Sequence, residues 1–325
     1  MTAGSGSMIS PPLVICLMGP TAAGKTALAV ELARRFPVSI VSVDSALVYR
    51  RMDIGTGKPG PEVLAEVPHQ LIDIREPWES YSAGEFLRDA RAAIEGIVAA
   101  GRVPLLVGGT MLYFRSLWQG LSELPQADGE VRAEIDLRAA AIGWPALHAE
   151  LALVDPLTAQ RLQPADRQRI QRALEVYRLT GVPLSAQQRR ASHTSDLRFL
   201  RIAVIPQDRR LLHARIEARF REMLGRGFVA EVEGLMQLSE MRADRPAMRA
   251  VGYRQLWGML AGDYDRAEAE RRALAATRQL AKRQLTWLRH EVCELRISME
   301  ADLVAEAAAA LRTHGVRDAL SASSG

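Results

Sequence analysis

Short, continuous apolar runs alternate along the chain with longer stretches in which apolar residues recur at helical spacing. The short runs are rich in Val, Ile and Leu, the composition of strands that are buried on both faces of a parallel sheet. They occupy residues 13–18, 38–43, 69–74, 103–107, 199–205 and 293–297. One helix has a clear start at the capping box Ser82-Ala-Gly-Glu85, and Gly101 ends it. This alternation predicts an α/β fold in which helices cover a parallel sheet.

The first apolar run leads into Gly19-x-x-x-x-Gly24-Lys25-Thr26, and a helical pattern follows at once. A strand, a glycine-rich turn and a helix in this order form a P-loop, whose backbone N–H groups and helix dipole hold a diphosphate. Lys25 adds a positive charge, and the Thr26 hydroxyl is placed to hold Mg²⁺. The residues expected to contact the diphosphate are Gly19, Thr21, Ala22, Ala23, Gly24, Lys25 and Thr26. The motif indicates a diphosphate but does not identify ATP.

Residues 124–195 contain only helical spacing, and the strand pattern returns at Phe199. We therefore predict an all-helical insertion domain between two strands of a P-loop-containing sheet. The C-terminal third is mostly helical, with candidate helices at 208–224, 228–238, 248–260 and 265–290. The predicted segments are the first part of the P-loop core in residues 1–123, the insertion domain in 124–197, and the completion of the core with C-terminal helices in 198–325.

The composition predicts a globular protein of the cytoplasm. None of the apolar runs among the 325 residues is long enough to span a bilayer. The segment Met1-Thr-Ala-Gly-Ser-Gly-Ser7 has neither the cationic start nor the apolar stretch of a secretory signal. Cys16 and Cys293 lie in apolar, strand-like runs, so we interpret them as buried residues rather than as a disulfide or zinc ligands.

Basic residues are nearly all arginine, within a net charge of +4. The three lysines, Lys25, Lys58 and Lys282, all lie in motif-like segments, which indicates that an ammonium group is needed there. Residues 271–290 contain no acidic residue but six cations, namely Arg271, Arg272, Arg278, Lys282, Arg283 and Arg289. A helix that only faces solvent usually interleaves charges, so this helix is predicted to face phosphates. The second half of the insertion is also basic and can be a solvated surface or a second contact with a polyanion.

Asp44 directly follows the second strand, at the edge of the sheet where open α/β proteins bind their ligands. A carboxylate there can act as a general base beside a diphosphate. The alternative is a carboxylate that holds Mg²⁺ or caps a helix. Tyr49, Tyr113 and Trp287 can stack on a nucleobase, although isolated aromatic residues at such positions also occur in cores.

Several motifs resemble those of the bacterial type of the tRNA dimethylallyltransferase family. The N-terminal ones are Gly19-Pro-Thr-Ala-Ala-Gly-Lys-Thr26, Ser42-Val-Asp-Ser-Ala-Leu-Val-Tyr49, Asp53-Ile-Gly-Thr-Gly-Lys-Pro59 and Gly108-Gly-Thr-Met-Leu-Tyr113. Residues 168–177, 249–254 and 276–289 resemble the RNA-facing segments of that family. The resemblance spans residues 13–289. Met111 stands where many members have Gly, and the zinc finger of the eukaryotic relatives is missing.

The resemblance implies an enzyme that transfers a dimethylallyl group from dimethylallyl diphosphate to N6 of the adenosine 3′-adjacent to the anticodon in tRNA, releasing diphosphate. It assigns the catalytic roles to Asp44 as the base, Thr110 as a positioning group, and Lys25 and Arg219 as charges on the leaving diphosphate. Arg219 also joins the diphosphate-binding set. The implied cofactor is Mg²⁺ on Thr26.

The resemblance also implies that the anticodon stem-loop of tRNA is the partner and that the target base is flipped into the pocket. The tRNA-binding residues it implies are Asp44, Ser45, Ala46, Leu47, Arg132, Gln168, Arg169, Ile170, Gln171, Arg172, Arg249, Gly252, Tyr253, Arg254, Arg278, Lys282, Arg283, Gln284, Trp287 and Arg289. We expect a monomer without a membrane partner.

Two other functions use the same residues. A small-molecule or nucleoside kinase would bind ATP at the P-loop and use Asp44 to activate a hydroxyl, with the basic insertion as a lid. A nucleotide-regulated RNA-binding protein would keep the basic surfaces and perform no chemistry. The basic helix at 271–290 favours the transferase over the kinase, because a lid does not need it.

Overall fold

The computed structural model describes residues 11–120, 124–189 and 196–319. The segment Met1–Ser7 and the arginine at position 190 lie outside these residues. The chain forms two compact units. The core unit comprises residues 1–114 and 196–325, and the insertion unit comprises residues 115–195. The boundary between them falls within α4 (Met111–Gln119), nine residues before the predicted start of the insertion at 124.

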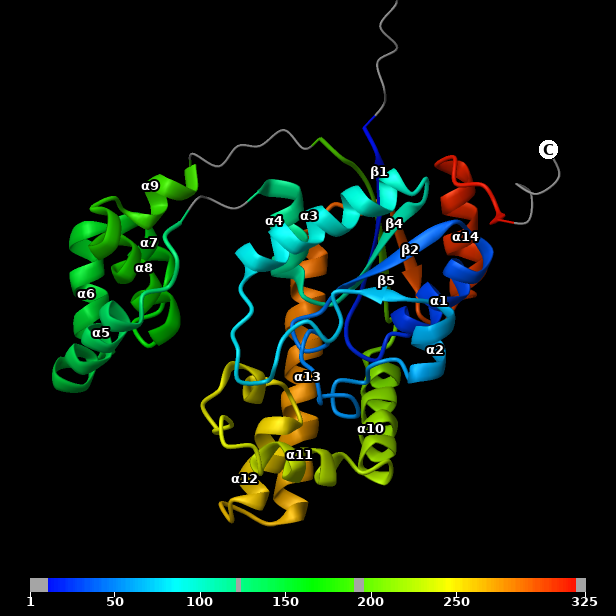
Figure 1. The fold of residues 1–325 in the computed structure, drawn as a ribbon. Coiled ribbons are helices and arrows are strands. Elements are labelled where there is room, and N and C mark those ends of the chain that lie inside the picture. Colours follow the sequence, from blue (N-terminus) through cyan, green and yellow to red (C-terminus); the bar gives the residue numbers. More distant parts are fainter. Residues whose placement is uncertain (1–10, 121–123, 190–195, 320–325) are drawn as a thin grey trace, which may run out of the picture. The chain divides into compact units, whose positions relative to one another are not determined.

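Six parallel strands form one sheet in the core unit, in the order β3-β2-β4-β1-β5-β6 (Figure 1). They are β1 (Leu13–Met18), β2 (Val38–Val43), β3 (His69–Gln70), β4 (Val103–Gly108), β5 (Arg198–Ile205) and β6 (Leu295–Ser298). The predicted α/β class is confirmed. The prediction of a strand over 69–74 was too long, because Leu71 and Asp73 adopt left-handed backbone conformations with φ of 62° and 55° that end the strand. Cys293 precedes β6 and is only partly buried, whereas Cys16 is fully buried.

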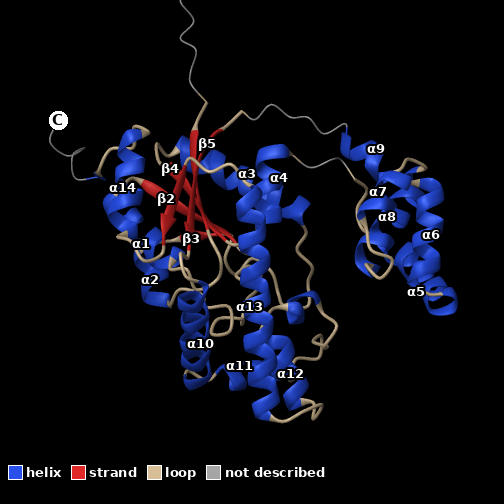
Figure 2. Ribbon diagram, turned by 180° about the vertical axis from the view of Figure 1, so that it is seen from behind, coloured by secondary structure: helices blue, strands red, loops and turns tan. Residues whose placement is uncertain are grey.

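Helices cover both faces of the sheet because the strand order reverses. The chain passes from β1 across β4 to β2, continues to the edge strand β3, and returns through α3 (Ala83–Ala99) to β4. Because parallel crossovers are right-handed, these opposite directions put α1 (Lys25–Arg35) and α3 on opposite faces. Figure 2 shows α1 on one side of the strands with α14 (Leu303–Thr313), and α3 on the other. The capping box of Ser82 and Glu85 at the start of α3 is present as predicted. The reversal places the end of β1 at a switch point, where such sheets bind ligands.

The C-terminal helices pack together around a second apolar core in the core unit. They are α10 (Arg209–Gly225), α11 (Phe228–Met236), α12 (Tyr253–Leu260) and α13 (Arg266–His290). The predicted helix at 248–260 is instead a 3₁₀ turn, η1 (Pro246–Arg249), followed by α12. The break has a local cause, since Gly252 has φ of 92° and cannot continue a helix.

The insertion unit is helical, as predicted, and lies in the sequence between β4 and β5. Its helices are α5 (Gly129–Ile142), α6 (Trp144–Val154), α7 (Pro156–Arg161), α8 (Arg167–Thr180) and α9 (Leu184–Arg189). Asp128, Asp155 and Asp166 cap the first turns of α5, α7 and α8. Ile135, Leu147, Leu151, Ile170 and Val176 are fully buried between these helices.

Candidate active site

The P-loop has the strand, turn and helix that the sequence predicts. Gly19 lies so close to β5 that a Cβ atom would contact the Val204 carbonyl oxygen at 2.7 Å. Gly24 forms the N-cap of α1 with φ of 90° and contributes no side-chain cap. The first N–H groups of α1 are therefore left without a capping side chain, the arrangement that binds anions at a helix N-terminus.

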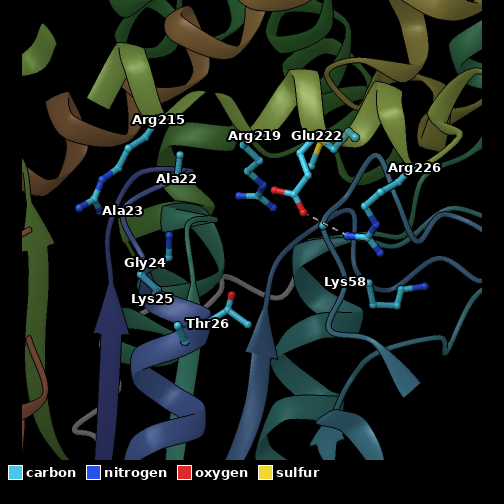
Figure 3. A pocket seen from close by; sticks show the side chains of 13 residues that line it. Ala22, Ala23, Gly24, Lys25, Thr26, Lys58, Arg215, Arg219, Glu222 and Arg226 are labelled. Carbon is cyan, nitrogen blue, oxygen red and sulfur yellow. Dashed lines mark ion pairs between the residues drawn. The ribbon is translucent and has the colours of Figure 1, made fainter. Parts of the chain in front are cut away.

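A cavity of about 360 Å³ lies between the P-loop and α10. Residues 22–27 line one side of it, and the other is lined by Arg215, Arg219 and Glu222 of α10 and by Arg226, which directly follows this helix. Figure 3 shows Arg219 extending from α10 toward the P-loop, and Arg226 on the side of the cavity where Lys58 lies. Glu222 lies 3.8 Å from Arg226 and offsets part of its charge. The remaining excess of positive charge suits a diphosphate.

Lys25 is held inside the P-loop, where its Nζ donates to the Pro20 carbonyl oxygen at 2.7 Å. Burial lowers the pKa of Lys25 to about 8, the Asp44 carboxylate raises it, and the Arg219 guanidinium lowers it further. Lys25, Asp44 and Arg219 are thus close enough to influence one another. A bound diphosphate would favour the charged ammonium form, because it adds negative charge at the same place.

Arg219 reaches the cavity from α10, as its predicted role requires. Its Nη2 donates to the Thr56 carbonyl oxygen at 3.2 Å, and desolvation lowers the pKa of its guanidinium. Arg215 and Arg226 were not predicted to line the site, although the four-residue spacing of Arg215 from Arg219 puts both on one face of α10 and Arg226 is the C-cap of the same helix. This spacing in the sequence could have indicated that these arginines lie near Arg219.

Asp44 and Thr110 lie at the ends of neighbouring strands β2 and β4. The Asp44 Oδ1 accepts from the backbone N–H groups of Ala46 at 2.8 Å and Leu47 at 3.4 Å. The Thr110 Oγ1 accepts from the Ser45 N–H at 3.1 Å, and the Thr110 N–H donates to the Val43 carbonyl oxygen at 3.3 Å. Hydrogen bonds from backbone N–H groups of residues 45–47 therefore fix both candidate catalytic side chains, which come from separate motifs.

Thr26 is the predicted ligand of Mg²⁺, and the residues present fit such an ion. Its side chain is exposed at the start of α1, and Figure 3 shows its hydroxyl on the side of the cavity. Within the described residues there is no group of three or more His, Cys, Asp or Glu side chains that could hold a metal. Mg²⁺ does not require one, since it commonly combines one or two protein ligands with substrate phosphates and water.

The loop of residues 49–59 is fixed by two charged side chains, the buried Lys58 and the partly buried Glu231. Lys58 donates to the carboxylates of Asp53 and Asp73 and to the Tyr49 carbonyl oxygen. Three acceptors around one nitrogen match the three donors of an ammonium group, which accounts for a lysine in this arginine-rich chain. This loop brings Gly57 and Lys58 to the cavity.

The second group is the partly buried Glu231 of α11, which the sequence analysis missed. Its carboxylate accepts from the N–H groups of Asp53, Ile54 and Gly55 and from the Tyr253 hydroxyl at 2.5 Å. Tyr253 is fully buried, so the predicted tRNA contact of its side chain is corrected to a role beneath the loop. The neighbouring Gly252 is also buried.

The basic helix α13 presents its cations unevenly. Arg271 and Arg272 both pair with Glu268, and Arg278 lies 3.6 Å from Glu217, so these three charges are partly neutralised. Glu268 lies in the first turn of α13, just before the acid-free stretch. Over the described parts of the chain, the exposed lysine and arginine residues of this helix that make no ion pair are Lys282, Arg283 and Arg289.

Gln284 and Trp287 of α13 are only partly exposed. The Gln284 amide contacts the protein itself, because its Oε1 accepts from the Thr21 N–H at 2.9 Å and its Nε2 donates to the Gly109 carbonyl oxygen at 3.0 Å. The Thr21 N–H, predicted to contact a diphosphate, is therefore occupied in this structure. Arg249 and Arg254 are exposed and form no ion pair within residues 11–120, 124–189 and 196–319.

In the insertion unit, a buried carboxylate holds two of the arginines predicted to bind tRNA. Glu175 accepts from Arg132, from Arg172 and from the Asp128 N–H. Ile170 is fully buried, so its side chain supports the core of the unit and does not reach a surface. Gln171 donates to Asp136 at 2.7 Å. The exposed members of the predicted set in this unit are Gln168 and Arg169.

The sheet order, the P-loop and the cationic cavity define a P-loop α/β protein with a site for a diphosphate ester. A profile of the family described as IPP transferase matches residues 47–291, and one described as isopentenyl transferase matches residues 12–78. The chain belongs to the IPP transferase family.

Named relatives agree with this assignment. The chain is 61% identical over 282 residues to the tRNA dimethylallyltransferase of Thioalkalivibrio sulfidiphilus, covering 86% of this chain and 88% of that protein. It is 55% identical over 305 residues to the one of Thiobacillus denitrificans, covering 94% and 97%.

Solved structures show the same fold. The full-length tRNA isopentenylpyrophosphate transferase of Bacillus halodurans matches with a TM-score of 0.67 and 33% identity, over 93% of this chain and 97% of that one. A eukaryotic dimethylallyltransferase acting on tRNA matches with a TM-score of 0.77 and 24% identity, over 93% and 79%. The resemblance read from the motifs is confirmed.

Proposed function

We propose that the protein transfers a dimethylallyl group from dimethylallyl diphosphate to N6 of the adenosine 3′-adjacent to the anticodon in tRNA. The observation that carries this proposal is the meeting of Lys25 and Arg219 at one cavity, beside Asp44, in a chain of the IPP transferase family. The kinase alternative has no support among these relatives, whose names describe transfer to tRNA.

Ionisation of the donor would depend on charge around its diphosphate. The bond between the dimethylallyl carbon and the diphosphate oxygen breaks, and the electron pair leaves with the diphosphate. Lys25 and Arg219, with the N–H groups at the start of α1, would stabilise the negative charge that develops there. Mg²⁺ held by Thr26 would supply further charge neutralisation when bound.

Attack by the adenine amine would require a base. The lone pair of N6 is delocalised into the ring, so the amine gains nucleophilicity if a proton leaves N6 as the carbon–nitrogen bond forms. Asp44 is the candidate acceptor, since one carboxylate oxygen is anchored by backbone N–H groups and the other makes no hydrogen bond in the described residues. Thr110 would fix the position of the Asp44 loop through Ser45.

RNA would be held by exposed cations of both units. We propose that Lys282, Arg283 and Arg289 of α13, with Arg249 and Arg254, contact phosphates of the anticodon stem-loop, and that the insertion unit contributes Gln168 and Arg169. No helix in the described ranges has the length and apolarity to cross a bilayer. A tRNA substrate favours a cytoplasmic location, and the monomeric state stays a prediction for sedimentation to check.

Transfer of label tests the proposal directly. The protein is incubated with Mg²⁺ and either dimethylallyl diphosphate labelled in the isoprenoid or ATP labelled in the γ-phosphate, with and without tRNA. Isoprenoid label should enter the RNA, and mass spectrometry of its nucleosides should find the added mass on the adenosine next to the anticodon. Transfer of phosphate label to a small molecule, or no transfer from either donor, would contradict the proposal.

A further inference from the structure

The neutral side chain of Gln284 connects α13 to two other parts of the site, the P-loop and the end of β4. Its Oε1 accepts from Thr21 of the P-loop at 2.9 Å, and its Nε2 donates to the Gly109 carbonyl oxygen at 3.0 Å. The contacted residues lie 263 and 175 positions away in the sequence. Gly109 is matched to this contact, since a Cβ atom there would collide with the Gln284 amide nitrogen.

The two contacted residues belong to the donor side and the acceptor side of the site. Thr21 lies in the P-loop, and Gly109 directly precedes Thr110, whose hydroxyl holds the Ser45 N–H beside Asp44. Gln284 also directly follows Lys282 and Arg283, the exposed cations proposed to meet RNA. A shift of α13 on binding a polyanion would therefore act on both loops through this amide.

A side chain other than glutamine does not reproduce the contact. Thr21 offers a donor and Gly109 an acceptor, so the bridging group must accept at one end and donate at the other, as a primary amide does. A carboxylate would face the Gly109 carbonyl with a second acceptor, and an apolar side chain would leave both backbone groups without this partner. The bridge therefore requires a side chain that has both the length and the amide group of glutamine.

We propose that Gln284 is a positioning residue that couples RNA binding on α13 to diphosphate binding at the P-loop. RNA that immobilises this end of α13 orders the bridge and with it Thr21, so the following diphosphate binds to a loop that has already lost freedom. The same link holds Thr110 in register with the P-loop. The inference rests on the proposed function for the identity of the RNA, but it concerns binding and needs no turnover.

The experiment measures the affinity of inorganic pyrophosphate with Mg²⁺, by calorimetry, in the absence and presence of a saturating anticodon stem-loop RNA. Wild-type protein should bind pyrophosphate about fivefold or more tightly with RNA present, the lower range of allosteric coupling. Gln284→Met should reduce this factor to about one, while its pyrophosphate affinity without RNA and its RNA affinity without pyrophosphate stay within about threefold of wild type.

Gln279→Met is the matched control, because Gln279 is exposed on the same helix and its side chain makes no hydrogen bond within the described residues. It should keep the full coupling factor. Gly109→Ala approaches the bridge from the other side, because its Cβ atom would displace the Gln284 amide and would lie 3.2 Å from the Gly19 carbonyl oxygen, and it should lower the coupling while the sequence of α13 stays unchanged. It also serves if Gln284→Met fails to fold, as judged by circular dichroism.

The inference would be overturned by an absence of coupling in the wild type or by full coupling in Gln284→Met. It would also be overturned if Gln284→Met lost pyrophosphate affinity equally with and without RNA, because the bridge would then only maintain the structure of the P-loop. None of these depends on isoprenoid transfer. Loss of the proposed activity with coupling intact would instead count against the proposed function alone.

Discussion

The guanidinium group of Arg219 occupies the space that a side chain at position 57 would need. A Cβ atom on Gly57 would overlap the Arg219 Nη2, and Gly57 has φ of 66°, which other residues adopt only with strain. Arg219 also donates to the carbonyl oxygen of Thr56, the residue before Gly57. Gly57 of the loop and Arg219 of α10 therefore form a single structural unit at the cavity.

Gly57→Ala is accordingly expected to displace Arg219 and weaken its contact with the diphosphate. We expect the KM for dimethylallyl diphosphate to rise about tenfold or more, with a loss of stability of about 1–2 kcal/mol from the left-handed backbone. Gly60→Ala is the control in the same loop, since a Cβ there meets no atom within 4 Å and φ is −64°. Equal kinetics for the two variants would show that Arg219 does not act through this position.

Binding of pyrophosphate should depend on pH through Lys25. The pKa of Lys25 is lowered to about 8, so in the unliganded protein the ammonium is mostly charged below that pH and is lost above it. The ratio of wild-type to Lys25→Met affinity should therefore fall as the pH rises from about 6.5 to about 9.5. Ionisation of pyrophosphate is common to both proteins and cancels in the ratio. A ratio that stays constant would show that Lys25 keeps its charge throughout.

Folding stability should respond to Lys25 in the opposite sense to binding. Its pKa in the folded state lies below the ordinary value of 10.5, so the unfolded chain binds this proton more tightly and the charged side chain disfavours folding below about pH 8. The penalty disappears as the pH rises toward 10.5. Without ligand, Lys25→Met should have a higher Tm than wild type at pH 7, and the difference should shrink at alkaline pH. A lower Tm for the variant at pH 7 would contradict this account.

Turnover should depend on the Asp44 carboxylate more than binding does. Asp44→Asn can still accept the backbone N–H groups of Ala46 and Leu47 through its amide oxygen, so the loop geometry is retained, but it cannot accept a proton from N6. We expect kcat to fall by about two to four orders of magnitude with tRNA affinity within about threefold of wild type. Single-turnover kinetics and filter binding separate the two quantities. Near-normal turnover would leave Asp44 with only a structural or metal-binding role.

The sequence predicted those parts of the site that a contiguous motif encodes. The P-loop is local, because Gly19, Gly24, Lys25 and Thr26 follow one strand and begin one helix. Lys58 stood out by composition before its three acceptors were visible. Arg219 was found only through the family resemblance, since α10 lies nearly two hundred residues after the P-loop.

Contacts that arise only from tertiary structure escaped the sequence analysis. Glu231 is one glutamate among many in a helical pattern, and nothing nearby shows that three backbone N–H groups of a distant loop point at it. Gln284 was assigned to RNA binding because it lies in a segment that resembles the RNA-facing segments of the family, whereas its amide contacts Thr21 and Gly109. Tyr253 was assigned in the same way and proved to be buried.

The cations of α13 should divide into two groups when tRNA binding is measured. Lys282, Arg283 and Arg289 are exposed and make no ion pair in the part of the chain that the structure describes, so each can replace condensed counterions on RNA. Arg271 and Arg272 share the carboxylate of Glu268, and RNA would have to compete with that ion pair. The cations near the start of α13 are therefore partly neutralised by an ion pair, whereas those near its end are available to RNA phosphates.

Substitution of Lys282, Arg283 and Arg289 together by Gln should weaken tRNA binding at fixed salt and lower the slope of log affinity against log salt by about two to three. Pyrophosphate affinity without RNA should change little. The double variant Arg271→Gln with Arg272→Gln is the matched control and should alter the slope by less than about one. If the folded triple variant keeps its tRNA affinity and slope, this face of α13 is only solvated, and the exposed residues Gln168 and Arg169 of the insertion unit become the next candidates for the RNA contact.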